Sequence, residues 1–201
     1  CEMIRDNNEI INLSNKKDNM FHKLTTGILV SMALAAIPSG AVAQNGAEEP
    51  IITFKTNIYD TYGAANSFHI TLGSTETDYF DVDCGFGMVE AEVSPWAFDQ
   101  ETQSIIGTPV QCCVNQDGLV KIYGDPTKID YIDFEGCYID WIEMDKLVNL
   151  EILDLSHNEL KRLDLSPFEK LYAIYLSDNP FTAETPLKVG SNHPALTILE
   201  L

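Results

Sequence analysis

A pattern of apolar residues that recurs about every 21 residues limits the fold of this chain more than any other feature. Four stretches begin at Ile129, Leu150, Leu171 and Leu196, so successive starts are 21, 21 and 25 residues apart. Each stretch has apolar residues at its first, fourth and sixth positions. An internal repeat of this length is typical of solenoids, in which each coil stacks on the next.

Within each stretch the apolar residues alternate with others, as in Leu153-Asp154-Leu155. This period of two predicts a short strand with both leucines on one face, whereas an amphipathic helix would repeat its apolar residues every three to four positions. We therefore expect parallel strands that stack along a solenoid. The side chains expected in its interior are Ile132, Phe134, Leu153, Leu155, Ile174 and Leu176.

The ninth position of the first three stretches is occupied by Cys137, Asn158 and Asn179. We expect the two asparagines to turn inward where the chain bends, because their amides can hydrogen-bond backbone groups that no strand partner reaches. Cys137 fills the same position with a small apolar side chain and a weak S–H donor.

These features resemble the leucine-rich repeat, L-x-x-L-x-L-x-x-N/C-x-L, over residues 129–201. Residues 50–128 contain short apolar segments and turns such as Asn115-Gln116-Asp117-Gly118, which is typical of a small β-sandwich. We therefore expect a mainly β fold, a small antiparallel β-sandwich followed by a leucine-rich-repeat solenoid with short parallel strands. The strands expected in the first segment are Ile51–Lys55, Ser67–Leu72, Tyr79–Cys84, Met88–Val93, Pro109–Val114 and Leu119–Tyr123.

The whole layout resembles secreted and surface leucine-rich-repeat proteins of the Bacteroidetes type, in which a β-sandwich module with a D-x-G-D-G turn precedes short internalin-like repeats. The corresponding stretch here is Asp83-Cys84-Gly85-Phe86-Gly87, where Phe86 replaces the second Asp of the turn. A plain immunoglobulin-like domain is the alternative interpretation of this segment.

Residues 20–43 have the layout of a secretory signal peptide, with a lysine near the start, an uncharged apolar run and Ala-Val-Ala ending at Ala43. The apolar run is about half of the ~20 residues that span a bilayer. We expect cleavage after Ala43, a secreted or cell-surface bacterial protein, and no membrane span in the mature chain. We interpret residues 1–19 as an upstream segment that is disordered or untranslated, and the repeats as incomplete at their C-terminal end.

The chain has 12 basic and 31 acidic residues, which gives a net charge of −19. Such a surface repels phosphate backbones and argues against a nucleic-acid partner. Solubility is the favoured explanation of the charge, and attraction of cations or of a basic partner is the second interpretation. Secretion would permit a disulfide between Cys84 and either Cys112 or Cys113, although buried free cysteines are also common.

The sequence contains no recognisable catalytic pattern. Its histidines are not spaced as a metal pair, and it lacks the nucleophile-elbow, P-loop and zinc-protease motifs. Asp78, Asp81 and Asp83 lack the Gly and the final Glu of an EF-hand loop, which favours a solvated strand face over calcium binding. We expect no catalytic residue, no metal and no cofactor.

We expect ligand binding on the outward face of the repeat strands, because a solenoid presents a broad and regular surface. Tyr131, Tyr175 and the nearby Trp141 are the expected anchors, because aromatic residues dominate interface energetics. We expect a non-catalytic secreted or cell-surface protein that recognises a protein or a glycan; the alternative is a structural spacer without a ligand of its own. The expected ligand-binding residues are Tyr131, Asp133, Glu135, Asp154, Ser156, Tyr175 and Ser177.

Overall fold

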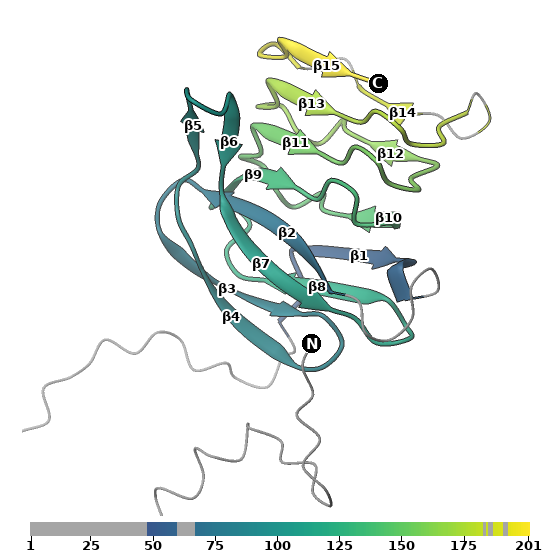
Figure 1. Cartoon of the computed structure of the whole chain (residues 1–201). Helices are drawn as coiled ribbons and strands as arrows, with labels where there is room; N and C mark the ends of the chain where they lie inside the picture. Colours follow the sequence, from purple (N-terminus) through teal and green to yellow (C-terminus); the bar gives the residue numbers. More distant parts are fainter. Residues whose placement is uncertain (1–47, 60–66, 183, 185–186, 191–192) are drawn as a thin grey trace, which may run out of the picture. The chain divides into compact units, whose positions relative to one another are not determined.

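The computed structural model describes residues 48–59, 67–182, 184, 187–190 and 193–201. The described part is mainly β, as expected from the sequence, and contains fifteen strands (Figure 1). The predicted upstream segment, residues 1–19, and the predicted signal peptide, residues 20–43, lie outside the described residues. No helix in the described part is long and apolar enough to cross a membrane.

The strands that precede the repeats follow the alternating segments of the sequence. All six expected strands are present, and a short hairpin of two further strands, β5 and β6, is additional. In chain order these strands are β1 (Ile52–Thr56), β2 (Ser67–Ser74), β3 (Asp78–Asp83), β4 (Met88–Val93), β5 (Ala97–Asp99), β6 (Ser104–Ile106), β7 (Thr108–Cys113) and β8 (Leu119–Tyr123). The repeats contribute β9 (Ile129–Asp133), β10 (Ile139–Glu143), β11 (Ile152–Asp154), β12 (Leu163–Asp164), β13 (Ala173–Tyr175), β14 (Leu187–Lys188) and β15 (Ile198–Glu200).

Two large sheets contain most of these strands. The five-stranded sheet has the order β10-β1-β8-β3-β4, and all its neighbours are antiparallel. The six-stranded sheet has the order β15-β13-β11-β9-β2-β7, in which the four repeat strands are parallel and the β9–β2 and β2–β7 pairs are antiparallel. The first repeat therefore enters both sheets, through β9 and β10, and residues 48–201 form one compact unit.

Both sheets contribute side chains to one hydrophobic core. The ring of Phe54, on β1, lies 6.4 Å from that of Phe68 on β2 and 5.2 Å from that of Phe134, which follows β9. A disulfide joins Cys84, after β3, to Cys112 on β7 and thus connects the two sheets. Of the two partners that the sequence allows for Cys84, Cys112 is the one whose side chain enters the core, where it is fully buried.

The repeat coils stack through their strands and through the turns that follow. The six side chains expected in the solenoid interior are no more than 1% exposed. Beyond the strand ladder, the N–H of Phe134 donates to the carbonyl of Asp154 at 2.9 Å, and that of Leu155 donates to the carbonyl of Tyr175 at 2.9 Å. The residue that precedes the Asn/Cys position adopts a left-handed backbone conformation in all three coils. The φ angles of Gly136, His157 and Asp178 are 63°, 55° and 56°. These residue types adopt that conformation at low cost.

Asn158 and Asn179 connect neighbouring coils from the inside. Asn158 Oδ1 accepts the N–H of Ile139 at 2.9 Å, and its Nδ2 donates to the carbonyls of Phe134 and Leu155 at 2.9 and 3.0 Å. Asn179 repeats this arrangement one coil later. Cys137 occupies the same position in the first coil, where its thiol donates to the carbonyl of His69 on β2, with Sγ and O 3.4 Å apart.

Asp130 is a buried carboxylate at the junction between β2 and β9. A bulge pairs Gly73 with Tyr131 and Ser74 with Ile129, which leaves Asp130 without a residue opposite it. Its side chain is 8% exposed, and Oδ1 has no hydrogen-bond partner among the described residues. Burial, with a smaller contribution from the charge of Glu151, raises the pKa of Asp130 to about 6.

The stacking of the coils predicts that substitutions at two nearby positions change the free energy of unfolding by different amounts. Asn158→Leu should lower the free energy of unfolding by about 1–3 kcal/mol, because it leaves buried backbone groups without partners. Lys161→Ala, at an exposed position of the same coil, should change it by less than about 0.5 kcal/mol. Urea unfolding measures both, and equal effects at the two positions would contradict the register of the coils.

Asp130 predicts a pH dependence of stability. Because its pKa is higher in the folded chain than in the unfolded chain, stability should fall as the pH rises from about 4 to about 6 and should then level off. Asp130→Asn should remove this part of the pH profile and raise the free energy of unfolding at pH 8 by up to about 2 kcal/mol. Asp81→Asn, an exposed carboxylate on β3, is the control. Parallel profiles for the wild type and Asp130→Asn would contradict the assignment.

Candidate functional site

The outward positions of β9, β11, β13 and β15 form the candidate site. In β9, β11 and β13 one set of alternating side chains enters the core, so the other set points outward, whereas all three residues of β15 are exposed. Parallel pairing aligns Asp133 with Asp154 and Tyr175, and Tyr175 with Glu200 on β15. No lysine or arginine lies within these four strands, so this face, which we call the repeat face, is acidic.

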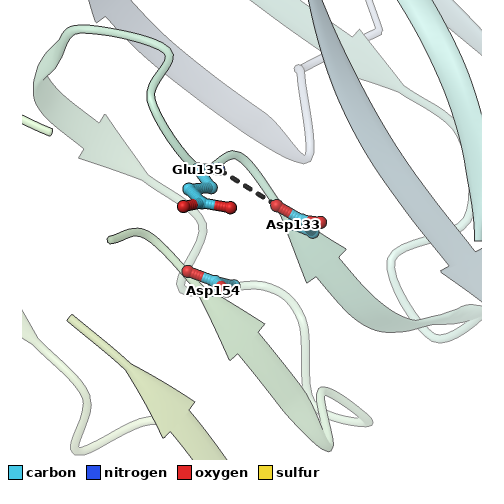
Figure 2. Close-up of side chains that lie close together, drawn as sticks. All are labelled: Asp133, Glu135 and Asp154. Atoms are coloured by element: carbon cyan, nitrogen blue, oxygen red, sulfur yellow. Dashed lines mark hydrogen bonds between the residues drawn. The ribbon is translucent and has the colours of Figure 1, made fainter. Parts of the chain in front are cut away.

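Three carboxylates meet at the carboxyl ends of β9 and β11. Asp133, Glu135 and Asp154 each bring one oxygen atom within 4.8 Å of the others (Figure 2). Backbone hydrogen bonds hold two of them in place: Asp133 Oδ1 accepts the N–H of Glu135 at 3.1 Å, and Asp154 Oδ1 accepts the N–H of Ser156 at 2.9 Å. The sequence places an acidic residue at each of these outward positions, and the coil spacing brings them together.

The environment of the three carboxylates favours an added positive charge. Burial is the main cause that raises the pKa of Asp154, and the charges of Asp133 and Glu135 raise it further, while hydrogen bonds from Ser156 oppose the shift. A cation placed between the three groups would remove the repulsion between them. Because hard divalent cations prefer carboxylate oxygens, the trio could hold one, and it could equally accept a lysine or arginine side chain.

His157 lies beside Glu135 and has a side chain that can carry a positive charge. Its Nε2 lies 3.6 Å from Oε1 of Glu135, and its Nδ1 lies 3.1 Å from Oδ2 of Asp178. All three side chains are more than half exposed, so these contacts contribute little to stability. His157 extends the polar surface of the site toward the next coil.

Tyr131 does not have the exposed position that the sequence suggests. It is 3% exposed because the β5–β6 hairpin covers it, with the ring of Trp96 centred 6.3 Å away. Glycine at positions 73 and 107 permits this close approach, since an added Cβ would lie 2.8 Å from atoms of Tyr131 in each case. The expectation that Tyr131 is an exposed ligand anchor is therefore wrong. Its hydroxyl donates to Asp133 Oδ2 at 3.2 Å and helps to orient that carboxylate.

The other expected site residues have different exposures. Tyr175 and Ser177 are half-buried on the repeat face, whereas Ser156 is 5% exposed and accepts a hydrogen bond from the Ser177 hydroxyl at 3.4 Å. Ser156 is thus too buried to be a main contact. Trp141, expected near this face, lies on β10 in the five-stranded sheet instead.

The sequence pattern identifies Tyr175, but not Trp96, Ile105 or Tyr172, among the residues that border the repeat face on the hairpin side. Trp96, Ile105, Tyr172 and Tyr175 pack around a small cluster formed by Tyr131 and its neighbours on β11 and β13. The signal that could have found the hairpin is the apolar-polar-apolar order of residues 96–106, in which a polar turn separates Ala97-Phe98 from Ile105-Ile106. That pattern predicts a hairpin but not the surface on which it packs.

The Leucine Rich Repeat family model matches residues 149–171, which span the second coil, from the residue before Leu150 to the start of the third. Comparison with curated proteins and with solved structures gives no match. The matched motif suggests a protein-interaction module. Together with the stacked coils and their inward asparagines, the match supports a leucine-rich-repeat protein.

Proposed function

We propose that this chain is a non-catalytic, secreted or cell-surface binding protein whose repeat face recognises a basic segment of another protein. The observation that carries this proposal is the charge of one sign on that face. Three carboxylates lie within 4.8 Å of one another, and the four strands that form the face carry no lysine or arginine. A face of this kind repels acidic partners and attracts basic ones.

The mutual repulsion of the three carboxylates favours the binding of a positively charged group. Like charges held this close destabilise the free protein; burial is the main cause that raises the pKa of Asp154, and the charges of Asp133 and Glu135 add to it. A lysine or arginine from a partner would form charge-assisted hydrogen bonds with these carboxylates and relieve their repulsion in the same step. Such binding weakens as salt is added, because the carboxylates are partly exposed to solvent.

Aromatic and apolar side chains beside the three carboxylates provide the apolar contact area that a protein interface needs. Tyr172 and Tyr175 are half-buried, so each has a fixed ring with one part exposed. Rigid aromatic side chains of this kind contribute large contact areas at low entropic cost. The hairpin also exposes Phe98 and Ile106, by 53% and 54% of their surfaces. The partner segment would therefore combine basic and apolar residues.

The alternative function is a spacer whose repeats only extend the chain. A spacer needs soluble coils but has no need for three mutually repelling carboxylates in one place. The carboxylate trio therefore favours binding over a purely structural role, and the following experiment separates the two.

A matched pair of triple variants tests the proposal. The first, Asp133→Asn/Glu135→Gln/Asp154→Asn, removes the charge of the trio; the second, Asp81→Asn/Glu90→Gln/Glu92→Gln, removes the same charge from exposed positions of β3 and β4. A displayed library of random peptides, assayed in EDTA to exclude divalent cations, should yield lysine- and arginine-containing ligands for the wild type. The first variant should bind them at least about tenfold more weakly, and the second should bind them normally.

Two outcomes would contradict the proposal. Equal loss of binding in both triple variants would mean that only the total charge matters, and a wild type that selects no basic peptide would favour the spacer. Thermal unfolding serves as the control for folding. The first variant should be at least as stable as the wild type, because it removes repulsion between like charges.

The disulfide supports the secreted part of the proposal, since such bonds persist mainly in oxidising compartments. When the chain is expressed from Met20 in a bacterium with a general secretory pathway, we expect a mature protein that begins at Gln44. Mass spectrometry of its unreduced peptides should detect a disulfide-linked pair that joins Cys84 to Cys112. Retention of the uncleaved chain in the cytoplasm would overturn the proposal of secretion.

A further inference from the structure

Strands β10, β12 and β14 lie on the side of the coils away from β9, β11, β13 and β15 (Figure 1). β10 pairs with β1 and β12 pairs with β14, but β10 and β12 do not pair with each other. This break in pairing leaves a groove, a cavity of about 500 Å³ lined by Trp141, Ile142, Arg162, Leu163, Asp164, Glu184 and Lys188. The volume is within the range of about 300–1,000 Å³ that is usual for small-ligand sites.

Strand alternation on β10 and the 21-residue spacing of the coils determine which side chains point away from the core and into the groove. Ile142 pairs with the fully buried Phe54 and shares its inward direction, so its neighbour Trp141 points outward beside Lys55. Trp141 is half-buried, which fixes its ring and leaves part of it exposed. Arg162 follows Trp141 by one repeat of 21 residues and is exposed, so an aromatic ring and a guanidinium lie at equivalent positions of adjacent coils.

The charges that line the groove are balanced. Arg162 and Lys188 are basic, and Asp164 and Glu184 are acidic. Lys188 Nζ lies 2.6 Å from Asp164 Oδ2 and also donates to the hydroxyl of Ser166 at 3.3 Å. The hydrogen bond from Lys188, with those from Ser166, lowers the pKa of Asp164 to about 2, so this acceptor remains ionised. Arg162 has no ion pair with another described residue, and its donors are free for a ligand.

We propose that this groove binds a neutral oligosaccharide. A sugar ring presents a flat C–H surface that packs on an indole ring, and its hydroxyls both donate and accept hydrogen bonds. The groove offers a matching set: the indole of Trp141, the donors of Arg162 and the carboxylate acceptors of Glu184. Because the lining charges cancel, a charged ligand would gain no net attraction there, in contrast to the repeat face.

This site is separate from the repeat face, so its test does not depend on the proposed protein partner. Isothermal titration of the whole mature chain with maltotriose, cellotriose and tri-N-acetylchitotriose, and with sialyllactose as an acidic comparator, measures binding directly. We expect saturable binding of at least one neutral trisaccharide in the millimolar range or tighter, and weaker binding of sialyllactose.

Matched variants assign the binding to the groove. Arg162→Ala should weaken it about tenfold, because it removes charged donors. Lys161→Ala removes an exposed charge from the adjacent position, which does not line the groove, and should leave binding unchanged. Trp141→Ala should abolish binding, whereas Tyr79→Ala, at an exposed aromatic residue on β3, should not affect it.

Three results would overturn the proposal: no saturable binding of any neutral trisaccharide, equal losses in Arg162→Ala and Lys161→Ala, or tightest binding of sialyllactose. Urea unfolding of each variant accompanies the titrations. Because Arg162 is exposed and the described structure gives it no internal contact that folding requires, Arg162→Ala keeps the test decisive even if Trp141→Ala fails to fold.

Discussion

The pairing of β9 on both of its edges is the interaction on which the rest of the structure depends. One edge bonds antiparallel to β2, and the other bonds parallel to β11. A solenoid leaves the apolar face of its first coil open unless something covers it. Here β2 and the five-stranded sheet cover that face. The thiol of Cys137 donates a hydrogen bond to the carbonyl of His69 on β2, at the position where the later coils have asparagine. The same pairing sets the register of each later coil.

That register explains which features could be predicted from the sequence. The alternation in Leu153-Asp154-Leu155 specifies both the buried pair and the outward carboxylate, because a slip of one residue would exchange them. The positions of Asn158 and Cys137 follow from the same spacing. In residues 50–128, alternation and glycine turns locate the strands. They do not determine which strands pair or how the two sheets share one core. The signal-peptide and secretion predictions remain untested by the structure.

Other features depend on contacts between distant segments. Tyr131 has the sequence environment of an exposed residue, and it is buried only because a hairpin some thirty residues earlier packs on it. Trp141 follows the first repeat strand closely in sequence but belongs to the other sheet, since the chain turns between β9 and β10. The choice between Cys112 and Cys113 depends on which face of β7 points into the core. Local pattern carries no signal for these arrangements, because tertiary packing decides them.

The central claim is that the first segment and the repeats fold as one cooperative unit joined at β9. Residue-resolved amide hydrogen exchange tests it directly. We predict that slowly exchanging amides in β2, β9 and β11 open with the same free energy, because breaking the β2–β9 pairing would expose the core shared by both parts. If the amides of β11 and β13 exchanged through a separate opening of clearly lower free energy while β2 stayed protected, the repeats would be an independent domain and the account would be wrong.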